Sequence, residues 1–163
     1  MKRQHLNTTA SMKLILLCVG TLKAGPEKDL LDQYRTRLSW PFEMREVICR
    51  KIGSPDQVKS WEGELLLQAI DPDSVVVGLD ERGASLTSPE FAKILENYRD
   101  EGTKSLTFLI GGADGFSDAA RSRCQRLISF GQMTWPHLLV RGLLVEQIYR
   151  AQQILIGHPY HRV

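Results

Sequence analysis

The C-terminal tail of the chain carries side chains that could move protons or hold a phosphate group. The sequence closes with HPYHRV, which includes Tyr160, His161 and Arg162. An imidazole exchanges protons near neutral pH, and a guanidinium can pair with a phosphate through two hydrogen bonds. His158 and His161 have a spacing seen in metal sites, but the sequence has neither an HExxH motif nor a CxxC pair to complete one. The tail could therefore serve proton or phosphate chemistry, or it could be a frayed polar end of the last helix; we expect no metal.

Three glycine-containing segments could hold a ligand through their backbone. They are LDERG at residues 79–83, GGADG at 111–115 and GQMTW at 131–135. Glycine lets a ligand approach the main chain and permits a positive φ. No GxGxxG, Walker or GxSxG motif is present, so the usual nucleotide and hydrolase sites are not indicated. Asp114 favours a ligand that is neutral or cationic at that point, although each segment could also be a plain turn. His137 either hydrogen-bonds at a helix start or lines the third segment.

The elements that must position these segments alternate between strand and helix. Buried strands are predicted from apolar runs at residues 14–19, 75–79, 106–110 and 127–130, and an edge-like strand at 44–50. Helices are predicted at residues 26–38 and 55–69, from an N-cap at Ser88, from a cap at Ser117 and Asp118 to about residue 126, and after Pro136. This order indicates a three-layer α/β fold with a mainly parallel sheet of about five or six strands. Such sheets bind ligands at the carboxyl ends of their strands, where all three segments lie.

Length and composition indicate one globular domain. Of 163 residues, 42% are hydrophobic and 25% are charged. We expect the domain to cover residues 12–163, with residues 1–11 as a disordered N-terminal extension or an upstream start. The three cysteines lack metal-ligand spacing, which is typical of a reduced, cytoplasmic protein. No stretch reaches the roughly 20 apolar residues that span a bilayer, and the first residues are not a convincing signal peptide, so no membrane association is expected.

The positive charge is concentrated near the C-terminus. The net charge is +2, but residues 121–163 contain six arginines and one acidic residue, Glu146. This asymmetry suggests an anionic partner, although a basic surface without a ligand would look the same.

The last helix looks more apolar than one sheet face requires. Leu139, Leu143, Val145 and Tyr149 add to its core-facing positions. The helix is therefore expected either to pack partly against a second copy of the chain or to dock wholly within the monomer. Pro159 is expected to keep the tail extended, so that it projects beyond the helix.

Four stretches carry a resemblance to a known family. LIGGADGF, SFGQMTWPHLLVR, VEQIYRA and the terminal HPYHR closely resemble the bacterial ribosomal RNA large subunit methyltransferase H family, of the SPOUT class. The resemblance extends from Met12 to Val163. It implies an enzyme that uses S-adenosylmethionine to methylate N3 of a pseudouridine in a stem-loop of 23S ribosomal RNA. It also implies a C-terminal trefoil knot and a homodimer with the active site across its interface, so that the partners are the ribosome and a second copy.

The family pattern also implies which residues form the site. Cofactor contacts fall on Leu79, Gly111, Phe130, Gly131, Gln132, Met133, Thr134 and Trp135. Tyr160, His161 and Arg162 are candidates for substrate placement, proton handling and phosphate contact, with no role assigned to any one of them. Glu146 is a further possible base, or else an ion-pair partner of its arginine neighbours. A ribosome-binding protein that keeps the fold without catalysis is the alternative, and an α/β enzyme acting on small molecules is a third possibility.

Overall fold

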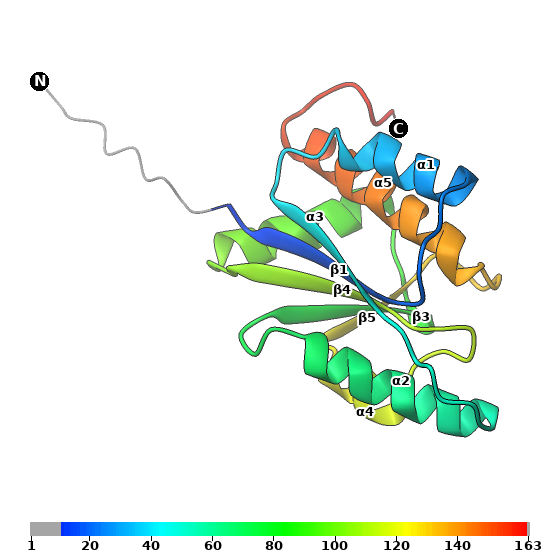
Figure 1. Ribbon diagram of the computed structural model, residues 1–163. Coiled ribbons are helices and arrows are strands. Elements are labelled where there is room, and N and C mark those ends of the chain that lie inside the picture. The colour runs from blue at the N-terminus through cyan, green and yellow to red at the C-terminus, as the bar shows by residue number, and fades with distance from the viewer. Residues whose placement is uncertain (1–10, 163) are drawn as a thin grey trace, which may run out of the picture.

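The computed structural model describes residues 11–162 and contains one five-stranded sheet. In these residues the strands are β1 (Lys13–Val19), β2 (Phe42–Val47), β3 (Val75–Ser85), β4 (Ser105–Ile110) and β5 (Arg126–Ser129). All pairings are parallel, in the order β2-β1-β4-β3-β5 (Figure 1). The predicted α/β class and parallel sheet are confirmed. The predicted extension at residues 1–11 lies outside the described residues, apart from Ser11.

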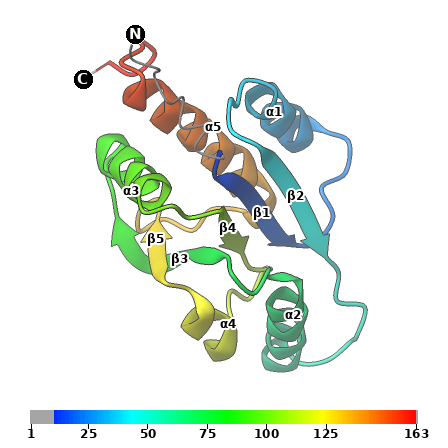
Figure 2. The ribbon, with the colours of Figure 1, turned by 90° about the vertical axis from the view of Figure 1, so that its left-hand side faces the viewer.

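Five helices cover the two faces of this sheet. They are α1 (Pro26–Arg35), α2 (Pro55–Ala69), α3 (Ser88–Asp100), α4 (Asp118–Arg123) and α5 (His137–Leu155). Helices α1, α3 and α5 share one apolar core with the sheet, and α2 and α4 share the other. Figure 2 shows α5 between α1 and α3. The three predicted layers are therefore present.

The centre of the sheet follows from the apolar runs. All residues of β1 from Leu14 to Val19 are buried, as are those of β4 from Leu106 to Ile110. A strand with helices on both faces needs apolar side chains in both directions, because neither face meets water. The carboxyl ends of these strands therefore meet at one well-anchored edge.

Strand β3 differs from its prediction. It runs on to Ser85, where the sequence predicted an end at Leu79 and then a loop. Leu79 and Ala84 both pair with Ile128, so residues 80–83 form a bulge inside the strand. A Cβ on Gly83 would lie 2.6 Å from the backbone of Ile128, so only glycine allows β3 to resume its pairing with β5 after the bulge. Residues 79–83 are therefore part of strand β3 and its bulge, and the predicted loop is wrong, although the segment still lies at the edge of the sheet.

Several predicted boundaries also move. Strand β2 begins two residues earlier than predicted and ends at Val47, and α1 and α4 end at Arg35 and Arg123. The predicted N-cap at Ser88 is wrong, because Thr87 caps α3 through a capping box with Glu90. The Ser88 hydroxyl instead donates to Gln147 in α5 at 2.8 Å.

Helix α5 buries much of its apolar surface within the protomer. Val145 and Leu144 are fully buried, so Val145 does not indicate a second copy of the chain. Leu139 and Leu143 remain half-buried. None of the helices between residues 11 and 162 has the length and apolarity that a membrane span requires.

Candidate functional site

A cleft of about 420 Å³ opens at the carboxyl ends of β3, β4 and β5. Neighbouring parallel strands end at the same edge, which is why three segments distant in the sequence meet there. Seven of the eight predicted cofactor residues line the cleft: Leu79, Gly111, Phe130, Gly131, Met133, Thr134 and Trp135. Gln132 does not line it. The volume falls within the roughly 300–1,000 Å³ of small-molecule sites.

The loop between β4 and α4 forms one wall through its backbone. Gly112 and Gly115 pair with each other, and Gly115 has a φ of 80° that other residues rarely adopt. A Cβ on Gly111 would lie 3.0 Å from the backbone carbon of Gly115 and 3.2 Å from the ring of Phe116. The turn therefore favours glycine at positions 111 and 115, and without side chains there the main-chain atoms lie at the cleft surface.

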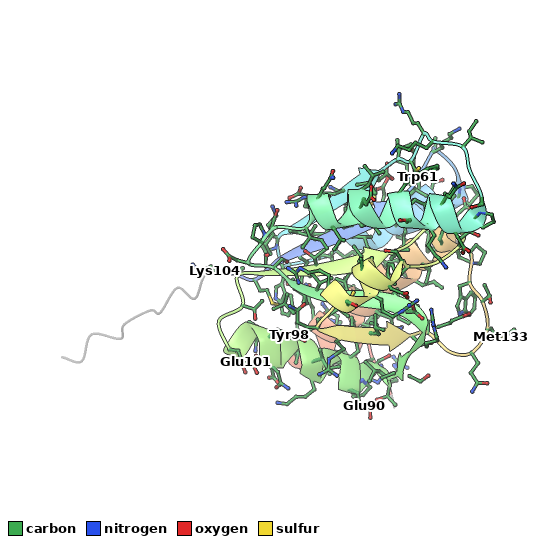
Figure 3. The ribbon with its side chains drawn as sticks, turned by 90° about the horizontal axis from the view of Figure 1, so that it is seen from below. Trp61, Glu90, Tyr98, Glu101, Lys104 and Met133 are labelled. Carbon is green, nitrogen blue, oxygen red and sulfur yellow. The ribbon has the colours of Figure 1, made fainter. Side chains whose placement is uncertain are left out.

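The loop between β5 and α5 forms the opposite wall and is held by its own hydrogen bonds. The Ser129 hydroxyl donates to the Gly131 carbonyl at 2.8 Å and accepts from the Gly131 N–H at 3.2 Å. The Trp135 indole donates to the Phe130 carbonyl at 3.4 Å. Met133 is 77% exposed at the tip, and Figure 3 shows it standing away from the sheet. The loop is therefore partly ordered but open to a ligand.

Asp80 and Arg121 form an ion pair at the bottom of the bulge. The Arg121 guanidinium contacts Asp80 Oδ2 at 3.1 and 3.2 Å, and the Asp80 side chain is only 7% exposed. Burial alone would raise the pKa of Asp80, but hydrogen bonds from the Arg82 backbone and from Arg121 outweigh it and lower that pKa. Arg121 is thus engaged in holding the bulge, and is not a free cation for a phosphate.

The side of the cleft near the glycine loop is acidic. Asp114 is exposed there, and the Glu62 carboxylate lies behind Gly112, where a Cβ would be 2.6 Å from Glu62 Oε2. Burial, and then the neighbouring Asp114, raise the pKa of Glu62. Asp114 therefore suits a ligand that is neutral or positively charged on that side, as the sequence had suggested.

An arginine that the sequence did not single out anchors the start of α5. Arg141 is 0% exposed and donates to Glu46 Oε1 at 2.9 Å and to the carbonyls of Val19 and Gly20 at 2.7 and 3.0 Å. The pair ties α5 to the ends of β1 and β2. The only feature of the sequence that could have indicated this buried ion pair is the presence of an arginine within an otherwise apolar helix face.

His137 lies one turn before this anchor and lines the cleft, as one of its two interpretations predicted. Burial, and then the charge of Arg141, lower the pKa of His137. The imidazole is therefore neutral at neutral pH and can accept or donate a hydrogen bond.

A second hollow of about 490 Å³ lies on the other side of the β5–α5 loop. It shares Ile128, Ser129, Phe130, Gly131 and Trp135 with the first cleft. Its remaining lining comes from the end of β3, the start of α3 and the middle of α5, including Glu146. One loop therefore separates two adjoining recesses.

The C-terminal tail folds back onto α5, so the expected projecting tail is wrong. The Tyr160 hydroxyl donates to Glu146 Oε1 at 2.9 Å, and its ring lies edge-on to Tyr149 with centroids 4.8 Å apart. Arg150 pairs with Glu146 at 2.5 Å and stacks on the Tyr160 ring. Burial, and then the bond to Glu146, raise the pKa of Tyr160, which therefore stays protonated.

The other two tail residues are less enclosed. His161 Nδ1 lies 3.4 Å from an Arg150 nitrogen, and Arg162 is exposed. None of the three tail residues lines the first cleft; the tail reaches the second hollow through Glu146. Within residues 11–162 no group of three or more His, Cys, Asp or Glu side chains is placed to hold a metal.

The chain is similar to a family of methyltransferases over almost its whole length. A family model described as predicted SPOUT methyltransferase matches residues 12–161. Relatives from Rhodospirillum centenum and Paramagnetospirillum magneticum are each 51% identical over 151 residues, which cover 93% of this chain and 99% of theirs. A relative from Dinoroseobacter shibae is 46% identical over 160 residues, covering 93% of this chain and all of its own. All three are named ribosomal RNA large subunit methyltransferase H.

Solved structures share the fold at low sequence identity. A probable methylase family protein from Haemophilus influenzae superposes with a TM-score of 0.58 at 11% identity, covering 93% of this chain and 71% of its own. A probable methyltransferase from Bordetella pertussis also reaches 0.58, at 13% identity, covering 86% of this chain and 94% of its own.

Proposed function

The chain belongs to the SPOUT methyltransferases, in the family of ribosomal RNA large subunit methyltransferase H, and we propose from this membership that it methylates large-subunit ribosomal RNA with S-adenosylmethionine. The observation that carries the proposal is the cleft at the carboxyl ends of β3, β4 and β5, which seven of the eight expected cofactor residues line. A protein that acts on the ribosome would work in the cytoplasm.

The cleft fits the chemical character of this cofactor. Leu79, Ile110 and Phe130 offer apolar surface for a purine, and the glycine loop brings main-chain groups within reach of its polar edge. When bound, S-adenosylmethionine supplies a methyl group already activated by a positively charged sulfur. Asp114, which lines the cleft beside the glycine loop, supplies the opposite charge there.

The finer proposal is that the acceptor is N3 of a pseudouridine. That nitrogen carries a weakly acidic proton, so the protein must place the ring and help the proton to leave. Tyr160 is protonated and donates to Glu146, so we assign it to placement and stacking instead of proton removal. His161 and Glu146 remain the candidates to accept the proton, and the exposed Arg162 is a candidate for phosphate contact.

The proposal includes a homodimer and a C-terminal trefoil knot, both supported by family membership. The half-buried Leu139 and Leu143 on α5 are consistent with a partner on that side. Light scattering tests the dimer: the expected mass is about twice the 18.5 kDa of the chain. A monomer at all concentrations would remove this part of the proposal.

Calorimetry and methyl transfer together test the proposed activity. Wild-type protein is expected to bind S-adenosylmethionine and to transfer labelled methyl groups to ribosomes from a strain that lacks the enzyme. Lys104→Ala, at the opposite edge of the sheet, is the control variant and should match wild type. Cofactor binding without transfer to any ribosomal particle would favour the non-catalytic ribosome-binding alternative. Absence of cofactor binding at millimolar concentration would refute the methyltransferase.

A further inference from the structure

The loops that follow β1 and β2 present cations that pair with no carboxylate of the described residues. Lys23 lies in the first loop, and Arg50 and Lys51 in the second; all three are exposed. None of them has a carboxylate oxygen within 4.0 Å among residues 11–162. Most other lysines and arginines of residues 11–162 make such contacts. Three cations without a carboxylate partner on adjacent loops therefore form a positively charged surface, here called the β1–β2 loop face.

The same face exposes large apolar side chains. Ile52, next to Lys51, is 97% exposed, and Ile48 is 49% exposed. Such exposure is unfavourable in water. Surfaces that bind single-stranded RNA combine cations for the phosphates with apolar, mostly aromatic, side chains for unstacked bases, and here the apolar part is supplied by isoleucines. An acidic protein surface would contact the cations but offers no unstacked base for Ile52, which lies beside Lys51 and is 97% exposed.

The loops are held in place by contacts beneath them. The Leu22 N–H donates to Glu46 Oε1 at 2.8 Å, which joins the loop after β1 to strand β2. A Cβ on Gly53 would lie 2.9 Å from the Trp61 ring, and the Lys51 ammonium lies 5.0 Å from the centre of that ring. Ser54 then caps α2 through a capping box with Gln57. The cations are thus presented by a supported loop, which lowers the entropy lost on binding.

The β1–β2 loop face continues into the cofactor cleft. On one side, a Cβ on Gly20 would lie 3.8 Å from His137, which lines the cleft. On the other side, α2 begins directly after the second loop and contributes Lys59 to the cleft lining. Figure 3 shows Trp61 and Met133 toward the same end of the molecule, with Lys104 at the other end. RNA whose target base meets the cofactor at the mouth of the cleft therefore has this face within reach.

We propose that the β1–β2 loop face binds the sugar-phosphate backbone of the RNA substrate outside the nucleotide that is methylated. This inference rests on the proposed function and adds to it the surface that selects an RNA partner. Arg50 and Lys51 contact phosphates, and Ile52 packs on an unstacked base. Lys23 extends the contact on the side of β1.

The test compares Arg50→Ala/Lys51→Ala with Lys104→Ala, which removes an exposed cation at the amino end of β4. Two readouts are used: binding of ribosomal particles measured by filter retention, and steady-state methyl transfer, both over a series of salt concentrations. Cofactor affinity by calorimetry and the melting temperature are measured for every variant.

Loss of two phosphate contacts should reduce the magnitude of the slope of log affinity against log salt by about 1.4 and weaken binding roughly 25-fold at about 0.1 M salt. KM for the particles should rise by the same factor, while kcat and cofactor affinity stay at wild-type values. Lys104→Ala should match wild type in every readout. Ile52→Ser should weaken binding without changing the salt slope, because it removes no charge.

Several outcomes would overturn the proposal. A double variant that matches Lys104→Ala in particle binding and salt slope would show that the face does not meet RNA. A fall in kcat with unchanged KM would place Arg50 or Lys51 in the chemical step instead. If the double variant unfolds, Lys23→Ala takes its place, and an unchanged salt slope there overturns the proposal. Particle binding that depends on this face without any wild-type methyl transfer would leave the inference standing and refute the proposed function.

Discussion

Replacing Glu46 by alanine tests the buried anchor of α5. Glu46 Oε1 accepts hydrogen bonds from Arg141 at 2.9 Å and from the Leu22 N–H at 2.8 Å. The Glu46→Ala variant keeps a guanidinium with no exposed surface beside the carbonyls of Val19 and Gly20, but removes its counter-charge. The start of α5, and with it the wall of the cleft at residues 130–136, would then lose its main tie to β1 and β2.

The size of the effect follows from the environment of the pair. Removing one partner of a buried ion pair typically costs about 3–5 kcal/mol, because the other charge is left uncompensated. The Glu46 side chain is 23% exposed, so water can partly replace it, and we expect a loss of about 3 kcal/mol. The double variant Glu46→Leu/Arg141→Met removes both charges and should be more stable than Glu46→Ala, since an apolar pair of similar volume is often tolerated.

Urea unfolding monitored by circular dichroism measures these free energies, with Glu64→Ala on the exposed face of α2 as the control. Cofactor affinity should also fall in Glu46→Ala, because the cleft wall loosens. A loss of less than 1 kcal/mol, or a double variant less stable than the single one, would refute the reasoning about the anchor.

Three further predictions concern the glycine loop, the tail and the response to acid. Gly111→Val places a branched side chain where even a Cβ would lie 3.0 Å from the Gly115 backbone. Cofactor affinity, measured by calorimetry, should therefore fall at least tenfold while the protein stays folded. An unchanged affinity would show that the cofactor binds elsewhere. Truncation after Pro159 removes the contacts of Tyr160 to Glu146 and Tyr149 but no helix or strand. Methyl transfer should be severely reduced, whereas the free energy of unfolding, measured by thermal unfolding, should fall by only about 1 kcal/mol. Transfer at the full-length rate would contradict the role of the tail. Hydrogen bonds from Arg45 and then from Lys13 lower the pKa of Glu43 from 4.5 to about 2, so the stability that this carboxylate contributes is present above pH 4.5 and is lost as the pH falls toward 2. Glu43→Gln should therefore flatten this part of the curve of unfolding free energy against pH. An unchanged curve would contradict the assignment.

The layers and the position of the cleft followed from local patterns. Apolar runs such as Leu14 to Val19 need burial on both faces, so their alternation with helices indicates a parallel sheet whatever the detailed packing. Glycines after those runs then marked the edge at which the cleft lies, and resemblance supplied the individual residues. These inferences depend on neighbouring residues, which is why they held.

What the sequence did not indicate depends on contacts between distant segments. The return of β3 at Gly83 depends on the backbone of Ile128, and the role of Arg141 depends on carbonyls more than a hundred positions away. Tyr160 folds back because Glu146, Tyr149 and Arg150 offer it partners on α5, a preference that Pro159 alone could not reveal. Thr87 and Ser88 are equally good caps by type, and only Glu90 three residues after Thr87 decides between them.

Methyl transfer to ribosomes followed by nucleoside mass spectrometry is the decisive experiment for the proposed activity. Ribosomes from a strain lacking this protein are incubated with the purified chain and S-adenosylmethionine, and the large-subunit RNA is then digested to nucleosides. We expect a pseudouridine with one added methyl group on N3, formed by wild type and by Lys104→Ala but not by Gly111→Val. An unchanged set of nucleosides, with cofactor bound by the same protein sample, would contradict it.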